Sequence, residues 1–239
     1  MDMTKEALQF ITGMKEPYIT NIDGENYSDK PLTRISYNPK AKCLKMSTLT
    51  SLVDYIKAKV DSMDEKMLVH VESPECVRLV SMLDDERERE EIVEVIASVP
   101  QFNYGKYMDH ESFLIAMQSK FLPGEDRDLI LKFAGTVESG TVATYGDDGV
   151  SQKATVKKGI AGKEDALVPN PVRLCPFRTF VEVDQPESAF VFRMRDYGDG
   201  VECAVFEADG GAWRNVAMKN IAEYLKHELE ELKQFTVIS

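Results

Sequence analysis

The chain has 239 residues, of which 43% are hydrophobic and 29% are charged, and its formal net charge is −12. This composition supplies apolar material for a core of roughly one or two domains and excludes a wholly disordered chain. The sequence contains no run of about 18 apolar residues and no apolar segment after its early acidic residues, so neither a membrane span nor a signal peptide is expected.

The N-terminal region is expected to begin with an amphipathic helix over residues 1–14. Gly13 and Pro17 end this helix, and loop-forming residues fill the stretch 17–39. The apolar side chains that recur at helical spacing are Leu8, Ile11 and Met14.

Short strands at 32–37 and 42–46 are then expected to precede a second helix over residues 47–63. Its Ser/Thr cluster offers N-caps, and its apolar residues form one stripe. That stripe consists of Leu49, Leu52, Val53, Ile56 and Val60.

Two strands are predicted next, at 66–72 and 76–83, joined by the turn residues 73–75. The β-branched stretch 90–99 is interpreted as a third strand. Its glutamates also suit a helix, but Pro100 follows and the two preceding strands require a neighbour.

A helical region follows in the middle of the chain. Asp109 is expected to cap a helix that runs to Phe121 and is broken by the Pro-Gly pair at 123–124. Asp126 is expected to cap a shorter helix that ends at Phe133.

The remaining sequence predicts mostly strands. A hairpin is expected from 137–145 and 150–157, with a turn between them and a polar link at 158–165. Asp209 and the two glycines after it are expected to start a helix, with Trp213 anchoring that helix on the sheet. Three further strands are expected at 168–183, interrupted by prolines, at 189–196 and at 201–207, and the last helix at 213–233.

Segregated helices and strands of this kind predict an α+β fold, with antiparallel sheets, flanking helices and a long C-terminal helix. A soft boundary near Gly135 divides the chain into an α+β region, 1–134, and a β-rich region with the C-terminal helix, 135–239. One continuous domain is the alternative.

Four arginines and no lysine occur between residues 168 and 196 of this acidic chain: Arg173, Arg178, Arg193 and Arg195. On the strand 189–196, period-two alternation puts Phe190, Phe192 and Met194 on one face and Arg193 and Arg195 on the other. The preceding strand is expected to carry Arg173 and Arg178.

Two interpretations of these arginines stay open. In the first they form cross-strand ion pairs with acidic residues nearby. In the second they form a site for an anion or a partner, because guanidinium groups bind phosphate and carboxylate in bidentate fashion. The acids available for pairing are Glu182, Asp184, Glu187 and Glu202.

We identify no catalytic residue, no metal site and no cofactor from sequence motifs. His70, His110 and His227 lack a second ligand at zinc-type spacing, and no phosphate-binding or nucleophile-elbow motif is present. The lysine-rich stretch at 153–163 is interpreted as a solvated strand edge. Four widely spaced cysteines, without a CxxC, predict free thiols in a reducing cytoplasm.

Three segments resemble a known family: MDHESFLIAMQSKF, VPNPVRLCPFRTFVEVDQPESAFVFRMR and CAVFEADGGAWR. They are similar to the YfdQ-like proteins, which are phage- and prophage-encoded and of unknown function. The resemblance spans about residues 67–232. It transfers no catalytic residue. It implies the cytoplasm of a bacterial host during infection or lysogeny, and genes near replication or recombination functions.

The leading hypothesis is a non-catalytic phage accessory protein that binds and self-associates, with a host or phage protein as a further partner. The alternatives are a helper in DNA metabolism that contacts single strands through the arginine-bearing sheet, and a protein that binds or sequesters a nucleotide, with Phe180 or Phe192 stacking on the base. No membrane partner is expected.

Overall fold

The structure is a computed structural model, and it describes residues 4–13, 17–31, 40–143, 152–158, 162–168, 170–198 and 200–239. Within these, only the backbone is described for Thr12 and for residues 137–143, 152–158 and 162–168. The chain forms two compact units, Met1–Lys40 and Ala41–Ser239.

The described residues of the first unit form a helix and a hairpin. Helix α1 (Lys5–Gly13) lies within the predicted stretch 1–14. Strands β1 (Ile19–Ile22) and β2 (Glu25–Ser28) pair antiparallel across Asp23 and Gly24, whose φ angles are 54° and 88°. Two positive φ angles in a two-residue turn are the geometry that Asp-Gly favours. The prediction of a loop is therefore wrong for residues 19–28. The strand expected at 32–37 lies outside the described residues.

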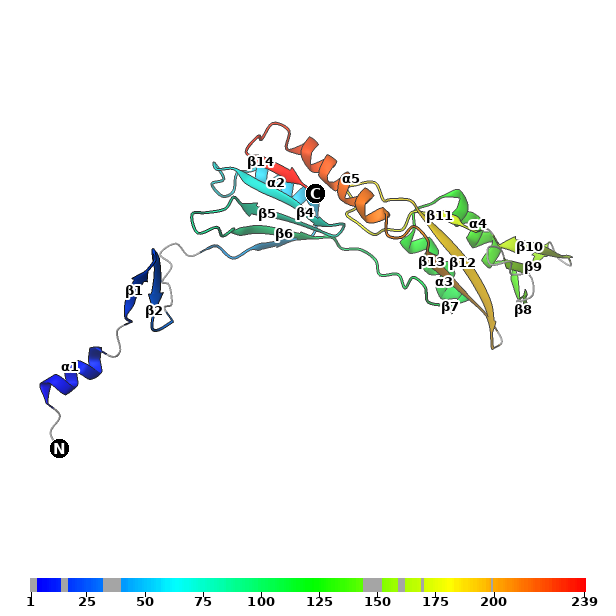
Figure 1. The fold of residues 1–239 in the computed structure, drawn as a ribbon. Coiled ribbons are helices and arrows are strands. Elements are labelled where there is room, and N and C mark those ends of the chain that lie inside the picture. Colours follow the sequence, from blue (N-terminus) through cyan, green and yellow to red (C-terminus); the bar gives the residue numbers. More distant parts are fainter. Residues whose placement is uncertain are drawn as a thin grey trace. The chain divides into compact units, whose positions relative to one another are not determined.

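A five-stranded sheet in the order β14-β4-β5-β6-β3 opens the second unit (Figure 1). Its central strands are antiparallel, whereas the edge strands β14 and β3 pair parallel to β4 and β6. The bounds are β3 Leu44–Met46, β4 Met67–Ser73, β5 Cys76–Ser81, β6 Glu91–Ile96 and β14 Phe235–Ile238. The strand interpretation of residues 90–99 is thus confirmed.

Helices α2 (Leu49–Lys57) and α5 (Trp213–Glu228) cover one face of this sheet. The side chain of Thr48 caps α2 by accepting from the backbone N–H of Ser51. Alternate residues of β4 to β6 meet the two helices, because successive side chains of a strand point to opposite faces. Both helices are shorter than predicted, and the strand β14 was not predicted.

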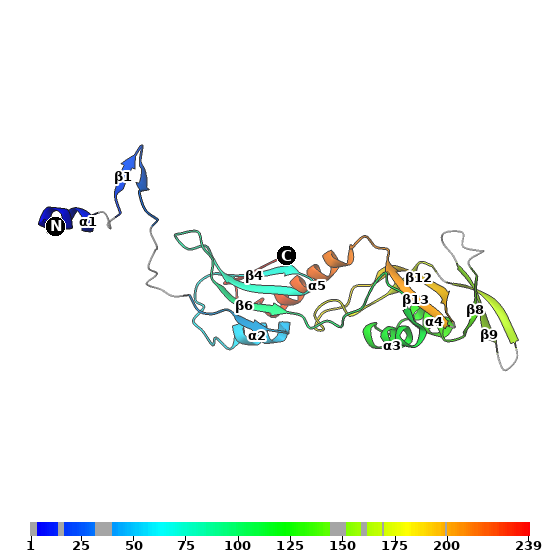
Figure 2. The same cartoon turned by 90° about the horizontal axis from the view of Figure 1, so that it is seen from below.

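A four-stranded sheet in the order β11-β12-β13-β7 forms the other half of the second unit. Figure 2 shows α3 and α4 against one face of it, and their side chains share a core with its strands. The Asp109 side chain caps α3, as predicted. Asp126 does not cap α4: its carboxylate accepts the backbone N–H of Arg173 at 2.6 Å instead. The bounds are β7 Met108–Asp109, α3 His110–Lys120, α4 Glu125–Ala134, β11 Val172–Leu174, β12 Ser188–Tyr197 and β13 Gly200–Glu207.

A third sheet has the order β10-β9-β8, with both pairs antiparallel. The predicted hairpin corresponds to β8 (Val137–Ala143) and β9 (Gln152–Lys158), and its turn lies outside the described residues. The prediction of a polar link at 158–165 was wrong, because β10 (Gly162–Val168) pairs along β9. Strand pairing has overridden the low β-propensity of its Lys, Glu and Asp residues.

The prediction of a strand at 168–183 was also wrong for the residues after Leu174, where β11 ends. Pro176 ends the ladder, since proline cannot donate to it. Residues 175–187 cross instead toward the five-stranded sheet. Phe180 is buried there in the core between that sheet and helices α2 and α5, which we call the first core. There Thr179 donates its hydroxyl to the Pro74 carbonyl at 2.5 Å.

The α+β class with mostly antiparallel sheets is confirmed. In the described part of the chain, no helix is long and apolar enough to cross a membrane. Gly135 ends α4 inside the second unit, and the domain boundary expected there stays a prediction.

Candidate functional site

Burial on β12 alternates as the sequence predicts. Phe190, Phe192 and Met194 are buried against α3 and α4, whereas Arg193 and Arg195 lie on the opposite face. The apolar and cationic faces of this strand are therefore separate.

Arg195 forms a cation–aromatic cluster on the outer face of the sheet. Its guanidinium pairs with the Glu202 carboxylate at 2.6 Å, which confirms the predicted cross-strand pair. The same group lies 4.1 Å from the ring centroid of Tyr107 and 5.5 Å from that of Tyr197. The side chain is still 49% exposed. This cluster is accessible to a partner.

The neighbouring arginines are engaged as well. Arg173 pairs with Glu187 at 2.8 Å, as expected, and its side chain is 69% exposed. Arg193 donates to the backbone carbonyl of Phe192 at 3.2 Å.

Arg178 departs from the expectation, because it lies in the crossing segment and its side chain is only 5% exposed. It pairs with Glu207 at 2.9 Å and donates to the Ser188 hydroxyl. Its guanidinium lies 4.1 Å from the ring centroid of Trp213 and 5.5 Å from that of Phe190. This cation therefore sits on the aromatic side of the sheet, and not on its outer face.

The segment that carries Arg178 is held by one amide side chain. The Gln185 carbonyl oxygen accepts the backbone N–H groups of Arg178 and Thr179, and its amide nitrogen donates to the Phe180 carbonyl. These contacts replace the ladder that Pro176 ends, and they fix the position of the guanidinium.

Asp209 completes the network around Arg178 and lies in the turn before α5, whose N-cap residue is Ala212 and not Asp209. Its carboxylate accepts from the Ser188 hydroxyl at 2.8 Å and from the backbone N–H groups of Gly211 and Trp213. Gly210 and Gly211 have φ angles of 63° and 82°, so the expected role of the glycines is confirmed.

Burial and charge change the proton affinities of this network. Burial lowers the pKa of Arg178 and raises the pKa of Tyr104 to about 12. For Asp209, burial acts to raise the pKa, but the hydrogen bonds from Gly211, Ser188 and Trp213 and the charge of Arg178 outweigh it, so the pKa is lowered. The cluster therefore holds a stable cation and a stable carboxylate, not a proton donor near neutral pH.

Two acids expected to pair with arginines have other roles. Glu182 accepts the backbone N–H of Thr50 at 3.2 Å, at the start of α2. The backbone carbonyl of Asp184 accepts from the side chain of Asn220 on α5. Both residues tie the crossing segment to the first core, so this part of the pairing prediction was wrong.

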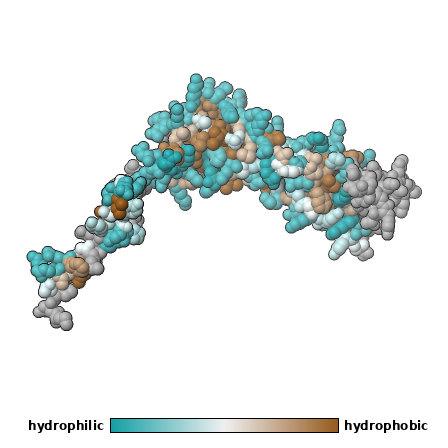
Figure 3. All heavy atoms as spheres, in the orientation of Figure 1, coloured by the Kyte–Doolittle hydropathy of each residue, from teal (hydrophilic) through white to brown (hydrophobic). Residues whose placement is uncertain are grey.

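The first unit presents a second candidate surface. Among its described residues, the large apolar side chains are each between 46% and 71% exposed, and Figure 3 shows hydrophobic residues on the surface of this unit. They are Leu8, Phe10, Ile11, Tyr18, Ile19, Ile22 and Tyr27. We name this set the N-terminal apolar surface. Leu8 and Ile11 belong to the apolar stripe of the predicted helix, whereas the hairpin residues were missed because the hairpin was not predicted.

The other candidates add little. The ring of His110 contacts the Ala134 carbonyl at 2.8 Å. No group of three or more His, Cys, Asp or Glu side chains among the described residues could hold a metal ion. The lysine side chains of the stretch 153–163 lie outside the described residues. All four cysteines are free, and burial raises the pKa of Cys203 to about 12.

Comparison of the chain with models of protein families, with curated proteins and with solved structures finds no match.

Proposed function

We propose that this protein is a non-catalytic binding protein that self-associates through its N-terminal apolar surface. The single observation that carries the proposal is the exposure of every large apolar side chain of that surface. The setting that we propose is the bacterial cytoplasm during phage infection or lysogeny, and it rests on the resemblance to the YfdQ-like proteins.

The first unit is too small to bury these side chains by itself. A two-stranded hairpin is marginally stable in water, and a chain of about 40 residues seldom forms a sufficient core alone. Each buried apolar side chain stabilises an assembly by roughly 1.5–3 kcal/mol, so pairing with a second copy would offset the ordering of the unit.

The Arg195 cluster offers a second, polar contact surface. Arginine and tyrosine are enriched at protein interfaces, because both combine a flat contact area with hydrogen-bonding groups. The half-exposed guanidinium between Tyr107 and Tyr197 fits this pattern.

The proposal is tested by the mass of the full chain in multi-angle light scattering. We expect an oligomer for the natural sequence and a monomer for the double variant Phe10→Ser, Tyr18→Ser. The matched control is Val181→Ser, which removes an apolar side chain that is 73% exposed in the second unit. A monomer for the natural sequence at every concentration contradicts the proposal.

The single-strand DNA alternative is less well supported. Arg173, Arg178 and Arg195 each pair with a carboxylate, and these carboxylates compete with the phosphates of a strand. Fluorescence anisotropy of a labelled oligonucleotide at two salt concentrations tests this alternative, and a lack of signal at low salt excludes it.

A further inference from the structure

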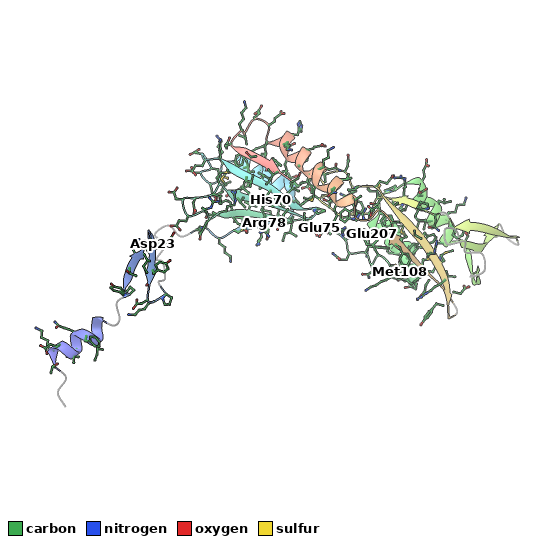
Figure 4. The ribbon with its side chains drawn as sticks, viewed as in Figure 1. Asp23, His70, Glu75, Arg78, Met108 and Glu207 are labelled. Atoms are coloured by element: carbon green, nitrogen blue, oxygen red, sulfur yellow. The ribbon has the colours of Figure 1, made fainter. Side chains whose placement is uncertain are left out.

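A pocket of about 140 Å³ lies where the five-stranded and four-stranded sheets meet. Segments distant in sequence build its wall: the β4–β5 turn at Glu75, residues 99–102 with Tyr104, residues 177–178, Glu207 and residues 213–214. Figure 4 shows Glu75 and Glu207 at this junction. A cavity of this size holds about one six-membered ring.

Two side chains that line the pocket carry a buried N–H group that lacks an acceptor among the described residues. The two groups are Nε of Arg178 and Nε1 of Trp213. In native proteins such donors normally find a partner in the chain, a ligand or an ordered water. Both donors belong to side chains that line the pocket, but each nitrogen is itself covered by protein atoms.

Arg214 adds an uncommitted cation to the same wall. Its guanidinium lies 5.0 Å from the ring centroid of Trp213, and within the described part of the chain it forms no ion pair. It lies in the first turn of α5, which contains no acidic residue. A cation there opposes the helix dipole, so the position favours a bound anion.

Gly211 lets Arg214 take this position. A Cβ atom built on Gly211 would lie 2.5 Å from a terminal nitrogen of Arg214. The φ angle of +82° at the same residue also disfavours any side chain. The turn before α5 therefore leaves room for the guanidinium above the Trp213 ring.

Two of the nearby carboxylates are already engaged. Glu207 pairs with Arg178, and Asp209 accepts from Ser188, Gly211 and Trp213. Glu75 also lines the pocket, and this residue is exposed to solvent. The wall thus offers one exposed guanidinium, that of Arg214, beside aromatic rings.

We propose that this pocket binds a small planar anion, which is one aromatic or heteroaromatic ring that carries a carboxylate or a phosphate. The ring packs against Tyr104, Phe177 and Trp213, and the anionic group pairs with Arg214. Pyrimidine nucleotides and aromatic carboxylic acids share this chemistry. The site does not depend on self-association.

The emission of Trp213 reports on this pocket directly, because it is the only tryptophan in the chain. The full chain is titrated with uridine monophosphate and with benzoate, and each titration is repeated by calorimetry. Uridine tests the ring without the anion, and inorganic phosphate tests the anion without the ring. We expect saturable binding of at least one ring anion, at least tenfold tighter than uridine and phosphate.

Arg214→Gln should weaken that binding at least tenfold. Lys219→Gln is the matched control, because it removes the same charge from an exposed side chain of the same helix. Binding of the nucleotide alone or of benzoate alone supports the site and identifies the source of the ligand. The proposal is overturned if neither ring anion binds up to millimolar concentration, if uridine binds equally well, or if both variants bind like the natural sequence.

Discussion

At the scale of single residues, the four arginines of one short region have different roles. Arg195 and Arg173 form exposed pairs with Glu202 and Glu187, whereas Arg178 is buried among aromatic rings. The alternation of β12 was predictable, because a period of two follows from strand geometry. The position of Arg178 was not, because Pro176 ends the strand and the periodicity with it.

Replacing Arg178 by alanine should destabilise the fold by about 3 kcal/mol, because it removes a buried cation and leaves Glu207 and Ser188 without their partner. Arg173→Ala is the control, since it breaks an exposed pair that contributes under about 1 kcal/mol. Urea unfolding of both variants measures the difference. Equal losses would contradict the distinction drawn between the two arginines.

The low pKa of Asp209 predicts part of the acid sensitivity of the fold. A carboxylate whose pKa is lower in the folded state contributes stability above its unfolded pKa of about 3.9, and this stability is lost as the pH falls through the folded value. Asp209→Asn should therefore lower the melting temperature at pH 7. The difference in melting temperature between this variant and the natural sequence should become smaller below about pH 4. Melting curves across this range check the sign, and a gap that widens in acid would refute it.

At the scale of elements, long patterned segments were predictable and short paired ones were not. Helices α2 and α3 have cap residues that the sequence displays, and α5 has buried apolar residues at helical spacing. The hairpin β1–β2 could have been found from its Asp-Gly turn. Strands β10 and β14 have no local signal of comparable strength, since pairing with β9 and β4 defines them.

Strand β14 closes one edge of the five-stranded sheet, and Phe235 anchors it in the first core. Phe235→Ala should cost about 3 kcal/mol of unfolding free energy, through lost burial and a cavity. Ile238→Ala on the same strand removes a side chain that is 43% exposed, and it should cost under about 1 kcal/mol. Thermal unfolding compares the two variants. Similar melting temperatures would show that β14 is not anchored in this way.

At the scale of the whole molecule, the second unit has two cores and a crossing segment that joins them. Phe180, Thr179 and Glu182 from residues 175–187 contact the five-stranded part of the unit, although β11 and β12 on either side belong to the other sheet. The chain also returns to the first core through α5 and β14. Local sequence patterns do not record such long-range returns, which is why the α+β class was predictable and the arrangement was not.

Hydrogen exchange of the full chain at high and low protein concentration tests self-association most directly. Backbone amides of β1 and β2 should exchange slowly at high concentration and fast on dilution, because only a second copy covers the N-terminal apolar surface. Amides of α3 serve as the internal reference and should not change. Exchange of the hairpin amides at one rate, whatever the concentration, would contradict the account.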